Sequence, residues 1–197
     1  MLRNQPASLR PATSADATVI AGIYAPYVTD SIASFEQTPP DADEIARRML
    51  APPRLPWFLA TRSDAPVGYC YASHHRARPG YRWSVDCSVY LADDARGQGT
   101  ARALYEQLIP QLPVLGYVTA FAGIALPNPA SVKLHEALGF NPVGVFKSAG
   151  FKQGAWRDVG WWRLALRDPP PQPAPPRSWH PVHRPYQSSL QADVEWT

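Results

Sequence analysis

Residues 93–101 read DDARGQGTA, between the apolar stretch SVYL at 88–91 and the helix-forming run RALYEQLIPQL at 102–112. A glycine costs a helix about 1 kcal/mol relative to alanine, so Gly97 and Gly99 at this junction call for a compensating interaction. Bare backbone N–H groups at a helix N-terminus bind phosphate well. The junction therefore predicts either a phosphate-bearing ligand or a tight strand-to-helix turn without one.

Composition narrows the class of protein. The chain has 197 residues, of which 45% are hydrophobic, and this is enough for one domain with a well-formed core. The net charge is only +3 and no block of basic residues is present, so we expect a small anionic ligand rather than nucleic acid. Cys70 and Cys87 are predicted to be buried thiols in a reducing cytoplasm. We expect no signal peptide, membrane span or metal site.

The chain divides into a domain at residues 1–167 and a tail at residues 168–197. The tail holds eight of the 23 prolines and has no hydrophobic period. Such a segment is expected to be extended or disordered. The alternative is that it lies over the body or over a partner subunit through Trp179, Tyr186 and Trp196.

Within residues 8–167 the hydrophobic period switches repeatedly between that of a strand and that of a helix. Strands are expected near 8–13, 57–62, 67–73, 82–91, 117–125, 143–148 and 156–166. Helices are expected to begin near 16 and 41, to span 102–112, and to begin again at 128. The order β-α-α-β-β-β-α-β-α-β-β predicts an α/β fold with a mixed sheet covered by helices. Ligands are expected at the carboxyl ends of the strands.

Four stretches together resemble one family. RGQGTA at 96–101 fits the R/Q-x-x-G-x-G/A pattern of the GNAT N-acetyltransferases. SFEQTPP at 34–40, YRWSVDCSVYL at 81–91, and NPASVKLHEALGF at 128–140 followed by AGFKQGAWRDVGWW at 149–162 resemble its phosphinothricin N-acetyltransferase branch. That branch also acetylates methionine sulfone and sulfoximine. The resemblance covers residues 8–167 and implies a GNAT-type mixed central sheet flanked by helices, with acetyl-CoA as co-substrate.

The resemblance also implies where acetyl-CoA binds. The pantetheine arm is expected along the strand, on the backbone of Val89, Tyr90 and Leu91, where a main-chain donor polarises the thioester carbonyl. Asn128 is expected to cap the next helix and to bind the same arm. The pyrophosphate is expected on the glycine loop, whose residues are Arg96, Gly97, Gln98, Gly99, Thr100, Ala101 and Arg102.

Two side chains are candidates for catalysis. Asp86 lies on a central strand, where an unpaired acid is disfavoured; it is either paired with a neighbouring arginine or is the general base that deprotonates the amine. The resembling family usually has Glu there, so a water is expected to bridge the missing methylene. His135 is either an ordinary core or surface residue or, by resemblance, a substrate contact or the acid. Tyr90 and Tyr105 are less favoured as the acid.

Substrate recognition is assigned to the segment HHRARPGYRW at 74–83. Arg76 and Arg78 are two residues apart, so in an extended segment they face the same side. Two guanidinium groups suit a carboxylate or phosphinate; the alternative is that both are solvated loop residues. Phe35 and Tyr81 are expected to wall the pocket, and His135 to contact the substrate.

Three functions are compatible with these patterns. They are an acetyltransferase for a small amino-acid-like amine, a protein or peptide N-acetyltransferase, and an acyl-CoA-binding regulatory module without turnover. Relatives in the branch form homodimers, so we expect a homodimer in which the tryptophans of GWWRLAL at 160–166 are buried across a two-fold interface. The same tryptophans in the core are the alternative.

Overall fold

The computed structural model describes residues 7–181 of the chain. Its seven strands form one sheet in the order β1-β2-β3-β4-β5-β7-β6. The strands are β1 (Ser8–Pro11), β2 (Trp57–Arg62), β3 (Ala65–His74), β4 (Ser84–Leu91), β5 (Thr119–Ala125), β6 (Asn141–Lys152) and β7 (Ala155–Ala165). The helices are α1 (Ala17–Thr29), α2 (Ala42–Leu50), α3 (Thr100–Leu108), α4 (Gln111–Leu115) and α5 (Pro129–Ala137).

The predicted order of elements and the mixed sheet are confirmed. One expected helix is wrong in detail, because the run predicted over 102–112 is divided into α3 and α4 around Pro110. Proline lacks the N–H that would continue the hydrogen-bond ladder. The cap predicted for α2 is present, since the side chain of Asp41 accepts a hydrogen bond of 2.8 Å from the backbone N–H of Glu44.

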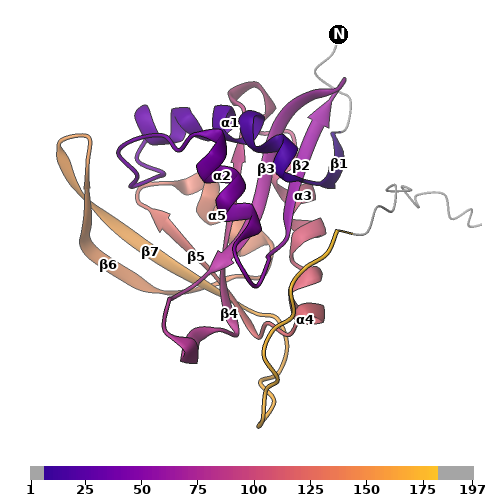
Figure 1. Ribbon diagram of the computed structural model, residues 1–197. Coiled ribbons are helices and arrows are strands. Elements are labelled where there is room, and N and C mark those ends of the chain that lie inside the picture. Colours follow the sequence, from indigo (N-terminus) through magenta and orange to yellow (C-terminus); the bar gives the residue numbers. More distant parts are fainter. Residues whose placement is uncertain (1–6, 182–197) are drawn as a thin grey trace, which may run out of the picture.

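Two cores lie on opposite faces of the sheet. Helices α1 and α2 contribute Ile20, Tyr24 and Ile45 to a core with Trp57 and Tyr69. The larger core on the other face contains buried residues of α3 and α4, with partly buried side chains of α5 packed against it. The hairpin of β6 and β7 projects from one end of the sheet (orange in Figure 1).

Two further expectations concern the cysteines and the absence of a membrane span. Cys70 and Cys87 are both buried and carry free thiols, as predicted. Within residues 7–181, the structure contains no helix that is long and apolar enough to cross a membrane.

The central strands β4 and β5 pair over only part of their length. β4 pairs in parallel with β5 only at Ser84, Val85 and Asp86. Beyond that point β4 continues beside β3 as far as Leu91, while β5 continues beside β7 as far as Ala125. The sheet therefore opens into a wedge whose apex is the pair formed by Asp86 and Phe121.

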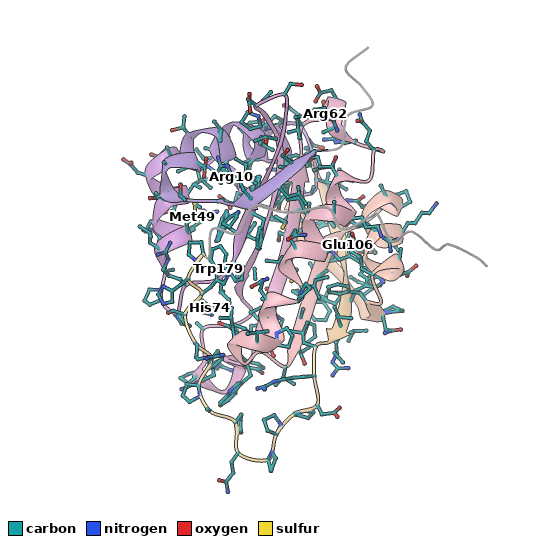
Figure 2. All side chains as sticks on the ribbon, turned by 90° about the vertical axis from the view of Figure 1, so that its right-hand side faces the viewer. Arg10, Met49, Arg62, His74, Glu106 and Trp179 are labelled. Carbon is teal, nitrogen blue, oxygen red and sulfur yellow. The ribbon has the colours of Figure 1, made fainter. Side chains whose placement is uncertain are left out.

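The described part of the proline-rich segment, residues 168–181, packs against the body without forming helix or strand. The backbone N–H of Arg177 donates to the carbonyl of Leu115, and that of Trp179 donates to the carbonyl of Arg54, each at 2.8 Å. Figure 2 shows the segment forming a loop at the bottom of the view and rising to Trp179, which is 6% exposed and packs against Phe58. The alternative in which the tail lies over the body therefore holds for residues 168–181. Tyr186 and Trp196 lie outside the described residues.

Because Trp179 fills a place in the larger core, Trp179→Ala is expected to lower the free energy of unfolding by about 3 kcal/mol. His180→Ala, on the exposed next residue, is the control and is expected to change it by less than about 0.5 kcal/mol. Urea unfolding of both variants measures the difference. Equal effects would show that the segment does not contribute to the stability of the core.

Candidate active site

A cleft of about 680 Å³ opens where β4 and β5 separate. Residues 87–91 of β4 and 122–125 of β5 form its walls. It is also lined from the α1 face by Tyr27 and residues 31–33, and from the other face by the start of α3 and by α5. The cleft therefore runs through the sheet and connects its two faces.

The backbone of β4 offers hydrogen bonds to this cleft. The backbone of Ala92 donates to Val67 on β3, and alternation along an antiparallel pair then directs the N–H and C=O groups of Cys87, Val89 and Leu91 away from β3, toward the opening. The hydroxyl of Tyr27 occupies both groups of Leu91, with distances of 2.6 Å to its oxygen and 3.1 Å to its nitrogen. Cys87 and Val89 are left to pair with a ligand.

This pattern refines the predicted pantetheine contacts. Val89 faces the opening as expected. Tyr90 directs its backbone into the ladder with β3, opposite Tyr69, and Leu91 is already bonded to Tyr27. Cys87, which was not predicted, has its backbone in the more favourable position. Tyr90 and Leu91 nevertheless line the cleft.

The glycine loop adopts the backbone conformation that favours glycine. Gly97 and Gly99 have φ of 72° and 79°, and no heavy atom lies within 4 Å of the position where a Cβ would stand. Gly99 is the N-cap of α3, so the N–H groups of the first helical turn are open to an anion. Six of the seven predicted loop residues line the cleft. The exception is Gln98, whose side chain donates to the carbonyl of Asp94.

Basic side chains surround the same end of the cleft, and Arg96, Arg102 and Lys133 all line it. Arg96 is held by an ion pair of 2.7 Å with Asp93 and lies 5.1 Å from the ring centre of Tyr27. Lys133 was not among the residues expected to bind the cofactor. Together with the helix N-terminus, these cations make this end suitable for a polyanionic ligand.

Asn128 and His135 both line the cleft from α5. Asn128 caps the helix, since its side chain accepts from the backbone N–H of Ser131 at 3.1 Å. Nδ1 of His135 lies 2.8 Å from the carbonyl oxygen of Ser131 and must donate to it, so Nε2 accepts from the hydroxyl of Tyr105 at 3.1 Å. Burial lowers the pKa of His135. This neutral, fully bonded ring fits the core alternative better than direct contact with an amine.

Asp86 stands at the apex of the wedge, on the α1 side of the sheet, and does not line the cleft itself. The alternative of an ion pair with an arginine is not observed among the described residues, where Arg76 acts on Asp86 only by its charge. Instead, Oδ1 of Asp86 lies 2.7 Å from Nδ1 of His75. Burial raises the pKa of Asp86, while the hydrogen bond and charge of His75 lower it. A carboxylate with a raised pKa is a stronger base than a solvated one.

Aromatic rings enclose His75. Its ring stacks on Phe121 with centroids 4.4 Å apart, and its edge meets Trp161 at 5.7 Å and Tyr81 at 6.1 Å. Trp161 also covers Gly123, a residue of the cleft wall. The cluster therefore adjoins the cleft at the apex of the wedge.

The predicted substrate residues have different fates. Tyr81 contacts His75, and the guanidinium of Arg76 lies 5.5 Å from the ring centre of Trp161. Residues 75–78 form a bend rather than a strand, so the expectation that Arg76 and Arg78 face the same side lost its basis. Among the described residues, no contact brings Arg78 to this cluster, and its side chain is exposed.

Phe35 packs on the β6–β7 hairpin. A Cβ at Gly150 would lie 2.5 Å from the Phe35 ring, so only glycine fits beneath it. Lys152, from the same hairpin, donates a hydrogen bond to the carbonyl of Glu36. These two contacts join the loop after α1 to the hairpin.

Comparisons with known proteins agree with this geometry. A family model described as "Acetyltransferase (GNAT) domain" matches residues 9–161. The chain belongs to the GNAT acetyltransferase family. A phosphinothricin N-acetyltransferase of Streptomyces viridochromogenes is 36% identical over 182 residues, 90% of this chain and 96% of that protein. An L-methionine sulfoximine/L-methionine sulfone acetyltransferase of Pseudomonas paraeruginosa is 34% identical over 163 residues, 81% and 95% of the two chains.

A solved GNAT structure extends the likeness. The crystal structure of a phosphinothricin acetyltransferase from Sinorhizobium meliloti in complex with acetyl-CoA has a TM-score of 0.76 and 34% identity, covering 94% of this chain and 98% of that one. The GNAT membership accounts for the glycine turn, the opened sheet and the cationic end of the cleft as an acetyl-CoA site. Within residues 7–181, no group of three or more His, Cys, Asp or Glu is arranged to hold a metal ion.

Some residues of the GNAT site were not found from the sequence. Tyr27 lies about 70 residues before the glycine turn and Trp161 about 60 residues after it, in an ordinary helix and strand pattern. His75 lies inside the quoted loop segment, but the signal was masked by the two arginines beside it. Only the three-dimensional meeting of β3 and β4 places His75 against Asp86.

The glycine loop can be tested by ligand-induced stabilisation. Acetyl-CoA is expected to raise Tm, because a ligand at 100 times its Kd stabilises the native state by about 2.7 kcal/mol. Gly99→Val is expected to abolish this shift, since a branched side chain obstructs the helix N-terminus. Gly154→Val is the matched control, because Gly154 has φ of 70° and open space but lies in the β6–β7 turn. A full shift in Gly99→Val would remove the loop from the site.

Proposed function

We propose that this GNAT protein transfers the acetyl group of acetyl-CoA to the amino group of a small amino-acid-like substrate, of the phosphinothricin or methionine sulfone and sulfoximine type. One observation carries the proposal. The cleft passes through the sheet from the phosphate-binding turn, and the partly buried carboxylate of Asp86 stands beside it at the apex of the wedge. The named activities of the related enzymes support the same conclusion.

The substrate side favours a compact amine over a peptide. The contacts of Phe35 with Gly150 and of Lys152 with Glu36 close one wall, where a peptide would need an open groove. The indole nitrogen of Trp161 is buried without a hydrogen-bond partner among the described residues, and an oxygen of the substrate would satisfy it. Arg76 beside it supplies a positive charge for a carboxylate or phosphinate.

The chemistry requires a neutral amine and a polarised thioester. An α-amino group has a pKa of about 8, so a base must take its proton at neutral pH; the carboxylate of Asp86 supports that role. The free N–H groups of β4, at Cys87 and Val89, are donors for the thioester oxygen.

A thiol-release assay with acetyl-CoA tests the function. We expect turnover with free amino acids, methionine sulfone, methionine sulfoximine or phosphinothricin, and none with Gly99→Val. Turnover with peptides alone would favour the peptide N-acetyltransferase. Tight binding of acetyl-CoA without turnover of any amine would favour the regulatory module.

We also propose that the protein acts in the cytoplasm as a homodimer. The expected tryptophans do not support the interface, because Trp162 is buried in its own core at 7% exposure and donates to Glu136, and Trp161 joins the aromatic cluster. The edge hairpin supports it instead. Val143, Val145, Phe146, Phe151 and Trp156 are exposed apolar side chains on β6 and β7.

Light scattering tests the dimer. The chain has a mass of 21.7 kDa, so the dimer corresponds to about twice that value in a symmetric pair. Trp156→Glu, at a residue that is 66% exposed, is expected to shift the protein to monomer without lowering Tm. Val114→Glu, equally 66% exposed but on α4, should leave the dimer intact. A wild-type mass of one chain at micromolar concentration would contradict the dimer.

A further inference from the structure

His75 and Asp86 lie 11 residues apart in the sequence and meet at the apex of the wedge. Nδ1 of His75 lies 2.7 Å from Oδ1 of Asp86. The side chains of His75 and Asp86 are 11% and 26% exposed. Both come from neighbouring strands or their ends, because β3 ends at His74 and pairs with β4 through Ser73 opposite Asp86.

This distance decides the tautomer of the imidazole. An ionised carboxylate only accepts hydrogen bonds, so Nδ1 of His75 must carry the hydrogen. In neutral His75 the lone pair is then on Nε2. Among the described residues Nε2 has no hydrogen-bond partner, and it is not among the buried side-chain atoms that lack one. A basic nitrogen oriented by a carboxylate and left unpaired is the arrangement of a general base.

We propose that His75, oriented by Asp86, is the general base that takes the proton from the substrate amine. Asp86 is then a positioning residue that fixes the tautomer and stabilises the imidazolium, and the imidazole takes the place of the water expected to bridge from the short aspartate. This inference rests on the proposed function and names the base of that same reaction.

His75 does not itself line the cleft but stands beside it at the apex of the wedge. Its ring lies on Phe121, the last residue of β5 that pairs with β4. Trp161 contacts His75 on one side and covers Gly123 of the cleft wall on the other. The ring is thus held between the apex of the wedge and the aromatic wall of the substrate side.

Nε2 of His75 removes one proton from the ammonium form of the substrate, and the freed nitrogen pair forms a C–N bond with the acetyl carbon of acetyl-CoA. The C–S bond then breaks, and its electron pair leaves on sulfur. The nitrogen loses its second proton as the amide forms. One proton returns to the thiolate to give CoA-SH and the other is released to solvent.

Neighbouring side chains act on the pair through charge and ring contacts. Arg76 acts on Asp86 by its charge and favours the carboxylate. Tyr81 meets His75 edge-on, and Tyr71, on β3, senses the charge of Asp86.

Substitutions of His75 that preserve its other contacts test the base. His75→Asn retains a donor near the Nδ1 position, and His75→Phe retains the stack on Phe121. Both are expected to lower kcat/KM for the amine by about 10²–10⁴-fold, the usual contribution of an acid–base group. The loss should shrink as pH approaches the pKa of the amine, and the acetyl-CoA-induced rise in Tm should be unchanged. Imidazole in the buffer should restore part of the activity of His75→Gly.

A double-mutant cycle with Asp86→Asn tests whether the two residues form one unit. If they do, His75→Asn/Asp86→Asn loses no more activity than the worse single variant, because residues of one catalytic unit are not additive. If Asp86 is a base that works through water, the two losses multiply. Asp86→Glu separates the same alternatives: the longer arm displaces the carboxylate from His75 and lowers kcat/KM, whereas a direct base of the family length would keep or raise it.

The outcomes distinguish this inference from the proposed function. If the wild type turns over an amine and His75→Asn has a kcat/KM within about twofold of the wild-type value, the pair is overturned and the acetyltransferase function is not. Losses that multiply in the double-mutant cycle would have the same meaning. A wild type that binds acetyl-CoA but acetylates nothing in the amine panel would overturn the proposed function, and the pair with it. Large, non-additive losses that narrow at high pH support both.

Discussion

The site depends on the early end of hydrogen bonding between β4 and β5. A parallel pair normally satisfies its backbone along its whole length, and buried unpaired N–H and C=O groups are costly. Here pairing stops at Asp86 and Phe121, and the protein tolerates the cost because the freed groups face an open cleft, where Tyr27 bonds Leu91 and a ligand or water can bond the others. The opening that results forms the cofactor cleft, and the pair formed by His75 and Asp86 stands beside it at the apex.

Each remaining part of the site is set by its distance from that apex. Five residues of β4 beyond it, followed by residues 92–95, lead into the glycine turn, so the pyrophosphate end is a fixed number of residues from the apex. On the other face, Phe121 supports His75, and Trp161 covers the gap left by Gly123. Because Gly123 on β5 has no side chain, the ring of Trp161 on β7 fills the space above it. The aromatic wall therefore reaches the cleft.

Periodicity and local chemistry predicted much of the fold. The element order, the caps at Asp41 and Asn128, and the glycine turn follow from short-range rules, because helix ends and positive φ angles restrict residue type locally. The break at Pro110 was available from the same rules. The partner of Asp86 was not, since an alternating strand shows which face a carboxylate occupies but not which loop lies against it. The buried Trp179 likewise depends on a long-range contact that a proline-rich composition conceals.

The hydroxyl of Tyr27 has a consequence for the length of ligand that the open strand accepts. By bonding both the nitrogen and the oxygen of Leu91, it ends the free edge of β4 one residue pair before the strand itself ends. Only Cys87 and Val89 remain, and the pantetheine arm carries two amide groups. For the expected pairing of pantetheine with β4, the hydroxyl of Tyr27 therefore limits strand-like hydrogen bonding to two residues. This limit would set the depth of the acyl-carrying arm when its phosphates reach the glycine turn.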